Sequence, residues 1–299
     1  MAPDPLTPYG NRPMVTPIVN AVNYEYLSFD VLREITDGEI EGYTYHRDDN
    51  PTVREVERQI ATLEGAEDCV VCTTGMAACT MVYLTYLAAG DHLILFHNTY
   101  GANYKVSLIL ENFGVEVTWL DADDAGRIGE QVRANTKMVF LETPTNPLCK
   151  VIDIAAVRKA ADAVGAMVVV DNTFATPYHQ QPLKLGADLV VHSATKALGG
   201  HNDLMAGAIA GSKEHYNLLW FTRQAIGTTL DAYSAFLLDR GLKTFPLRAD
   251  AMARGAQTVA EFLTGQPKIT RLFYPGLESH PQHEAAARQM HRGFGGMMA

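Results

Sequence analysis

The sequence has few features of a secreted, membrane-bound or nucleic-acid-binding protein. Only four of its 299 residues are cysteines, too few and too clustered for a disulfide framework, so we expect reduced thiols. No apolar run approaches membrane-spanning length, and the opening MAPDPLTPYGNRP lacks the charged start and apolar middle of a secretory signal. A net charge of −10 without a long basic run disfavours nucleic acid and anionic membranes as partners. These absences favour a cytoplasmic enzyme.

The cysteines and histidines are not spaced as metal ligands. Cys69 and Cys72 form a CxxC pair, but no second CxxC or histidine pair lies at zinc spacing. We interpret both as small apolar side chains of a buried strand. His280, His283 and His291 lie in a segment that matches no ligand pattern. The sequence therefore predicts no metal site.

Short apolar segments that alternate with helical ones indicate an α/β fold. With 299 residues and 47% hydrophobic content, the chain can bury a sizeable core. Alternation of strands with helices favours a mostly parallel central sheet with flanking crossover helices. The predicted strands are the segments DCVVCT, DHLILF, VEVTWL, KMVFLE, AMVVVD and DLVVHS.

The first part of the chain differs in composition from the rest. Residues 1–49 are rich in Pro, Asn and Tyr and show little periodicity, so they are predicted to form an extended arm. Asn50 and Pro51 then have the residue types that open a helix, and Gly65 is a typical stop. A helix is therefore expected between them.

The remainder divides into two predicted domains. The larger covers residues 50–235 and contains the predicted sheet. The smaller, over 236–299, is expected to contain helices at 247–263 and 283–291 and a strand at 269–275.

Two predicted strands end in groups that suggest a ligand site. Asp171 follows the segment AMVVV, and Ser193, Thr195 and Lys196 follow DLVV. Ligand crevices in open α/β sheets lie at the carboxyl ends of strands, so these groups are expected to share one. A lysine that forms a Schiff base and a carboxylate that keeps a ring nitrogen protonated are what pyridoxal phosphate (PLP) chemistry requires. The alternative is a turn-capping Asp171 and a solvated Lys196.

Further polar groups, from the backbone and from side chains, follow neighbouring strands. Gly75 and Met76 open a predicted helix whose N–H groups can bind an anion, although capping alone explains such a start. Tyr100 is placed to stack on a flat ring, or else packs in the core. Asn146, before a proline, suits either a hydrogen bond to a ring oxygen or turn formation. The pattern predicts that they surround the same crevice.

The ordered motifs YTYHRDDNPT, TTGMAA, Tyr100-Gly101, ETPTNP, DNTFATPY and VVHSATKALGGHND resemble those of the Cys/Met-metabolism (trans-sulfuration) family of PLP-dependent enzymes. The resemblance runs from about Tyr43 to the C-terminus. It implies the aspartate aminotransferase-like fold (fold type I) and PLP as cofactor. It also implies a homotetramer built as a dimer of dimers.

The resemblance assigns a role to each candidate residue. It implies that Lys196 carries the Schiff base, Asp171 pairs with the ring nitrogen and Tyr100 stacks on the ring. Asn146 is expected near the phenolic oxygen. The residues implied to hold the phosphate are Gly75, Met76, Ser193 and Thr195.

The arm also gains a function from the resemblance. In this family a Tyr-x-Arg segment, here Tyr45-His46-Arg47, reaches the phosphate of the neighbouring subunit. Tyr45 and Arg47 are therefore expected to complete the partner's pocket, and a monomer is expected to bind cofactor poorly.

The implied activity is γ-elimination or γ-replacement on cystathionine or O-acylhomoserine-type amino acids. Lys196 is expected to move the α-proton, and Tyr100 to act as acid or base near the leaving group. Cystathionine β-lyase activity stays open as an alternative. Methionine γ-lyase is less favoured, because those enzymes resemble one another in having Cys where this chain has Ala102.

Family members continue past the FGGM segment into a C-terminal domain whose arginine binds the substrate carboxylate, whereas this sequence stops at Ala299. We therefore expect an incomplete C-terminal domain over 236–299. We expect cofactor binding to be retained more readily than catalytic turnover. A catalytically impaired PLP-binding fragment is a further alternative. Aminotransferase or cysteine desulfurase activity is a poorer match to the motifs.

Overall fold

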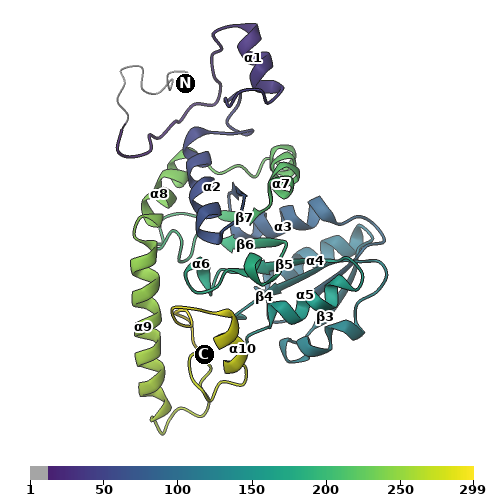
Figure 1. Ribbon diagram of the computed structural model, residues 1–299, viewed down its shortest axis with the longest axis vertical. Coiled ribbons are helices and arrows are strands. Elements are labelled where there is room, and N and C mark those ends of the chain that lie inside the picture. The colour runs from purple at the N-terminus through teal and green to yellow at the C-terminus, as the bar shows by residue number, and fades with distance from the viewer. Residues whose placement is uncertain (1–12) are drawn as a thin grey trace.

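The computed structural model describes residues 13–299, and within them a seven-stranded sheet forms the centre of the molecule (Figure 1). Its spatial order is β1-β7-β6-β5-β4-β2-β3. The strands are β1 Asp68–Cys72, β2 His92–Phe96, β3 Glu116–Leu120, β4 Thr136–Glu142, β5 Met167–Asp171, β6 Leu189–Ser193 and β7 Gly207–Gly211. All six predicted strands of the α/β domain are confirmed.

The sheet is mostly parallel, as expected, with one antiparallel strand that the sequence analysis missed. β3, β2, β4, β5 and β6 pair in parallel, whereas β7 pairs antiparallel with both β6 and β1. β7 reads GAIAG, in which Ile209 is the one β-branched residue and the other four are glycine or alanine, so it lacks the composition that marks a strand. Its small residues are required, because a Cβ on Gly207 would lie 2.1 Å from the carbonyl oxygen of Thr74.

Helices cover both faces of the sheet. The α-helices are α1 Phe29–Thr36, α2 Pro51–Glu64, α3 Gly75–Tyr86, α4 Ala102–Asn112, α5 Ile154–Asp162, α6 Thr176–His179, α7 Lys213–Ile226, α8 Ala232–Leu242, α9 Phe245–Thr264 and α10 His283–Gln289, with 3-10 helices η1 Ala122–Glu130 and η2 Pro182–Leu185. One apolar cluster joins α3, α4 and α7 to one face, and two others join α2 and α8, and α5 and η1, to the opposite face. The result is a three-layer α/β architecture.

The helix predicted after Asn50 is confirmed as α2. The Asn50 side chain accepts hydrogen bonds from the N–H groups of Thr52 and Val53, and Gly65 ends the helix in the left-handed conformation at φ 69°. The predicted helices at 247–263 and 283–291 are confirmed as α9 and α10. Figure 1 shows α9 running along one side of the molecule toward the C-terminal segment.

Two expectations about local structure were wrong. The stretch 269–275 is not a strand, and Phe273 instead exchanges backbone hydrogen bonds with Ala299. Within the predicted arm, residues 1–12 lie outside the described residues, but α1 is a helix that was not expected. The Ser28 side chain caps it, and none of its residues is buried, so it stands away from the sheet (Figure 1).

The structure agrees with the expected state of the cysteines. Cys69, Cys72, Cys79 and Cys149 are all free and buried. No cluster of metal-ligating side chains occurs among residues 13–299. Over the same residues, no helix combines the length and apolar character needed to cross a membrane.

Candidate active site

A cavity of about 600 Å³ opens at the carboxyl ends of β4, β5 and β6. Its size falls in the range of small-molecule and cofactor sites. Most of the sequence-predicted site residues line it, namely Gly75, Met76, Tyr100, Asn146, Asp171, Ser193, Thr195 and Lys196. The fold thus brings together residues up to 121 positions apart, from Gly75 to Lys196 (196 − 75).

Tyr45 and Arg47 do not line this cavity. The Arg47 guanidinium lies 5.0 Å from the centre of the Tyr45 ring and 3.7 Å from the carboxylate of Asp48. Both side chains are exposed. The backbone carbonyl of Arg47 accepts a hydrogen bond from Thr229 Oγ1 at 2.9 Å. The segment is therefore anchored to its own chain while its side chains face outward.

Asp171 ends β5 as a buried carboxylate. Its Oδ1 accepts hydrogen bonds from the Thr173 hydroxyl at 2.6 Å and the Thr173 N–H at 3.0 Å. Burial raises the pKa of Asp171, and these two hydrogen bonds, followed by the nearby His192, oppose that rise. The carboxylate is thus held in a fixed orientation, where a cation in the cavity would stabilise its charge further.

The start of α3 forms one end of the cavity. The Thr74 side chain caps the helix by accepting a hydrogen bond from the Ala77 N–H. The first N–H groups of a helix have no partner within the helix, so those of Gly75 and Met76 are available to an anion. A Cβ on Gly75 would lie 2.7 Å from Ser193 Cβ. Only glycine therefore lets the helix start approach the Ser193 hydroxyl this closely.

Lys196 lies in a tight loop between β6 and β7. Its N–H donates to the Ser193 carbonyl at 3.0 Å, and its own carbonyl accepts from Gly200 N–H at 2.7 Å. The Thr195 hydroxyl accepts from Ala206 N–H at 2.9 Å. These contacts fix the backbone and leave the Lys196 side chain facing the cavity.

Tyr100 lies at the rim of the cavity, just before α4. Its side chain is 54% exposed, so the structure does not place it in the core. Its backbone N–H donates to Glu142 Oε2 at 2.7 Å, and its carbonyl accepts from Asn103 N–H. The aromatic ring therefore extends from a well-anchored backbone.

Glu142, Thr173 and Asn103 also line the cavity, and the sequence analysis missed all three. Burial, and then the charge of Asp171, raise the pKa of Glu142 well above its usual range. The available signal was that Glu142 ends the strand KMVFLE just as Asp171 ends AMVVVD. Asn103 lies seven positions after the predicted strand DHLILF, which ends at Phe96 (103 − 96), and carried no such signal.

The cavity fits a cofactor that has an anionic group and a polar ring. The donors at Gly75, Met76 and Ser193 suit a phosphate, and the carboxylate of Asp171 suits a protonated ring nitrogen. Asn103 Nδ2 is buried and has no hydrogen-bond partner among the described residues. A buried donor of this kind is expected to find an acceptor when a ligand is bound.

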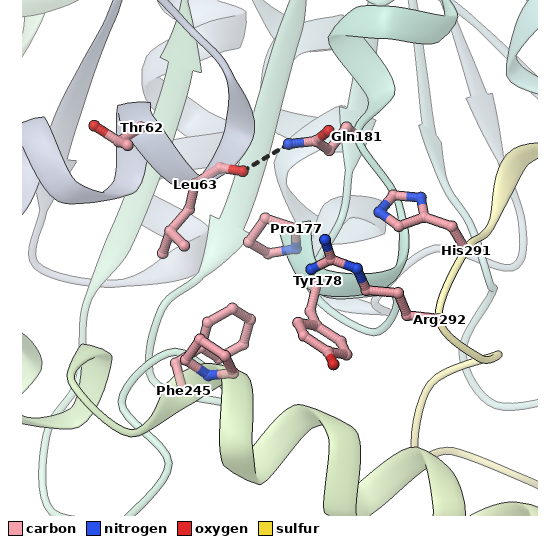
Figure 2. Close-up of a pocket in the computed structure, with 9 residues that line it drawn as sticks. Thr62, Leu63, Pro177, Tyr178, Gln181, Phe245, His291 and Arg292 are labelled. Atoms are coloured by element: carbon pink, nitrogen blue, oxygen red, sulfur yellow. Dashed lines mark hydrogen bonds between the residues drawn. The ribbon is translucent and has the colours of Figure 1, made fainter.

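A second cavity of about 210 Å³ lies elsewhere, between α2, α6 and the segment after α10 (Figure 2). The Arg292 guanidinium lies 5.1 Å from the centre of the Tyr178 ring, and Gln181 Nε2 donates to the Leu63 carbonyl at 2.9 Å. Neither a lysine nor a carboxylate lines this cavity. It therefore does not offer the pair of groups found at Asp171 and Lys196.

Known proteins resemble this chain over most of its length. A family model described as Cys/Met metabolism PLP-dependent enzyme matches residues 7–299. An L-methionine gamma-lyase of Fusobacterium nucleatum subsp. polymorphum is 42% identical over 262 residues, which cover 86% of this chain and 66% of that protein. A cystathionine gamma-lyase of Bacillus subtilis (strain 168) is 42% identical over 264 residues, which cover 88% of this chain and 69% of that one.

Solved structures agree with these matches. The crystal structure of cystathionine gamma synthase from Xanthomonas oryzae pv. oryzae in complex with cystathionine superimposes with a TM-score of 0.89 at 37% identity. The superposition covers 98% of this chain and 73% of that one. The chain thus spans about two thirds of the length of the curated relatives above.

Proposed function

Because the chain belongs to the Cys/Met metabolism family of PLP-dependent enzymes, we propose that it is a cytoplasmic trans-sulfuration enzyme. The cofactor of the family is pyridoxal 5'-phosphate. The proposed reaction is γ-elimination or γ-replacement on cystathionine or O-acylhomoserine-type amino acids. Relatives named for cystathionine and O-succinylhomoserine chemistry support this substrate class.

The observation that carries the proposal is the shared cavity of Asp171 and Lys196, closed at one end by the start of α3. In the proposal, Gly75, Met76, Ser193 and Thr195 hold the phosphate. Asn146 donates to the phenolic oxygen, and Tyr100 stacks on the ring. Asp171 keeps a proton at the ring nitrogen. PLP, when bound, supplies an electrophilic carbon for the substrate amine and a ring that accepts electrons as the substrate loses its α-proton.

Two side chains of the cavity are assigned proton transfers. Lys196 Nζ takes the α-proton and returns a proton elsewhere on the substrate, since it is the one amine among the described residues that line the cavity. The Tyr100 hydroxyl, at the rim, exchanges a proton near the leaving group. The position of Tyr100 depends on the hydrogen bond from its N–H to Glu142.

We further propose that the protein assembles as a dimer of dimers in which Tyr45 and Arg47 reach the partner's phosphate. Both side chains are exposed, and neither lines the cavity of its own chain. The carbonyls of Arg47 and Asp48 are held by Thr229, Trp220 and Arg223 at 2.8–2.9 Å. A segment anchored in this way can present its side chains to a neighbour at little entropic cost.

Two other functions have specific support. Relatives named L-methionine gamma-lyase and cystathionine beta-lyase are as similar to the chain as the others, so these activities are the first alternatives. A PLP-binding protein with impaired turnover is the second. No arginine lines the cavity among residues 13–299 to bind a substrate carboxylate.

Side-by-side assays of cystathionine, O-succinylhomoserine, O-acetylhomoserine and methionine test the proposal. We expect PLP-dependent release of 2-ketobutyrate, or formation of a replacement product, from one of the first three. Lys196→Ala is the matched control and is expected to lose the activity. Release of pyruvate from cystathionine would favour the β-lyase. PLP binding without turnover of any of the four would favour the impaired protein.

A further inference from the structure

Two carboxylates, not one, face the cavity from neighbouring strands. Glu142 and Asp171 are register partners at the ends of the parallel strands β4 and β5, so their Cα atoms are separated by about 4.8 Å and their side chains lie on the same face. Both line the cavity, and Glu142 is only 3% exposed. The proposed pairing with the ring nitrogen needs the charge of Asp171 and none from Glu142.

Burial of both charges side by side is unfavourable. Like charges on adjacent residues of a buried site raise each other's proton affinity, and a strongly interacting pair usually keeps one proton. The other titratable groups around Glu142 are Tyr100, Cys79, Cys149 and Lys196. Lys196 is the one amine among the described residues of the cavity, so it can offset one of two negative charges but not both. Burial raises the pKa of both thiols, so they are neutral and do not offset a second negative charge.

The hydrogen bonds of the two carboxylates differ. Asp171 Oδ1 accepts from the Thr173 hydroxyl and the Thr173 N–H, which favour its charged form. Within residues 13–299, the one donor to Glu142 is the Tyr100 N–H, bound to Oε2 at 2.7 Å. The charge is therefore more stable on Asp171, and the proton is more stable on Glu142.

We propose that Glu142 is a neutral positioning residue of this site. Its carboxyl group keeps its proton on Oε1, its Oε2 anchors the backbone of Tyr100, and Asp171 is left as the single negative charge opposite the ring nitrogen. The advantage of this arrangement for cofactor binding rests on the proposed function. A charged Glu142 would compete with Asp171 for the same cation, and an apolar residue would release the Tyr100 N–H.

Infrared spectroscopy of the cofactor-free protein tests the protonation directly and does not depend on activity. The spectra are recorded in an Asp49→Asn background, because Asp49 also keeps a proton up to about pH 7. We expect a C=O stretching band of a protonated carboxyl group that disappears when Glu142→Gln is added and persists when Asp171→Asn is added. A band that persists in Glu142→Gln and disappears in Asp171→Asn would overturn the proposal, because the proton would then reside on Asp171. Since no cofactor is needed, this result is separate from the success or failure of the proposed function.

Binding of PLP to three variants tests the positioning role. Glu142→Gln keeps an acceptor for the Tyr100 N–H and is neutral, so its affinity is expected to match that of the wild type. Glu142→Leu has a similar size but no acceptor, and its affinity is expected to fall about tenfold. Asp171→Asn is expected to lose more affinity for PLP than either Glu142 variant. If Glu142→Gln and Glu142→Leu weakened PLP binding equally, Glu142 would act through its charge, and the proposal would be wrong. Should Glu142→Leu fail to fold, the Gln variant and the infrared band still decide the question.

Discussion

The hydroxyl group of Thr173 lies 2.6 Å from Oδ1 of Asp171 and donates a hydrogen bond to it. The same hydroxyl oxygen accepts a hydrogen bond from the Ser193 N–H at 2.8 Å. One side chain thus joins the ends of β5 and β6, and it holds the proposed ring-binding carboxylate beside the proposed phosphate-binding residues.

Replacement of Thr173 by Val is expected to weaken PLP binding about tenfold, because a hydrogen bond to a buried charged group is lost while shape is kept. The pKa of Asp171 is already raised by burial, and loss of the hydroxyl would raise it further. Thr173→Ser retains the hydroxyl and serves as control. Fluorescence titration with PLP measures the effect. Wild-type affinity in the Val variant would contradict this role of Thr173.

Replacement of Gly75 by Ala is expected to weaken binding of PLP but not of pyridoxal, which lacks the phosphate. The new Cβ would lie 2.7 Å from Ser193 Cβ and 2.9 Å from Ser193 Cα, so the start of α3 would have to move. Gly129→Ala is the control, since no heavy atom lies within 4 Å of a Cβ there. Equal loss of affinity for both ligands would argue against a phosphate site at this helix.

Much of the sheet and of the cavity could be predicted because both follow from strongly patterned residues. Strands covered on both faces are continuous apolar runs, and Asp171 and Lys196 stand out where such runs end. The strand β7 escaped notice because close packing requires glycine at both of its ends, at Gly207 against Thr74 and at Gly211 against Leu189. No local pattern reports such a tertiary requirement.

The remaining errors have similar causes. The segment 269–275 has the composition of a strand, but strand formation depends on partners that local sequence does not specify. The helix α1 has only eight residues, none buried, so its pattern was too short to detect. Glu142 lacked a role until the register placed it beside Asp171. The functions of Tyr45 and Arg47 stay predictions.

The buried ion pair between Arg223 and Glu57 is expected to be important for stability. Arg223 Nη1 lies 2.6 Å from Glu57 Oε1, and both side chains are fully buried. Arg223→Met is expected to destabilise the fold by about 1–3 kcal/mol, because Glu57 Oε1 loses its charged donor while Arg54, 2.9 Å from Glu57 Oε2, stays as the remaining cation. The double variant Arg223→Met/Glu57→Gln is expected to lose less free energy of unfolding than the sum of the losses in the two single variants. Denaturant unfolding measures both. The exposed Arg127→Met is the control and is expected to have no measurable effect.

The half-buried Asp49 is expected to make stability depend on pH. Burial, followed by the negative charge of Glu57, raises the pKa of Asp49 to about 7. The folded chain then keeps a proton that the unfolded chain releases near pH 4, so this group's contribution to stability falls as the pH rises from about 4 to about 7.

Asp49→Asn is therefore expected to remove part of the decline in the free energy of unfolding over that pH range. The exposed Asp30→Asn is the matched control. Unfolding experiments at several pH values would compare the slopes. An unchanged slope in Asp49→Asn would show that Asp49 titrates at an ordinary pKa.

The most direct test of the account is to incubate the purified chain with PLP, reduce it with sodium borohydride and map the modified peptide. We expect one stable pyridoxyl label on Lys196, and its loss in Lys196→Ala. A folded chain that takes up no label, or that is labelled at another lysine while Lys196 stays free, would contradict the assignment of this cavity as the cofactor site.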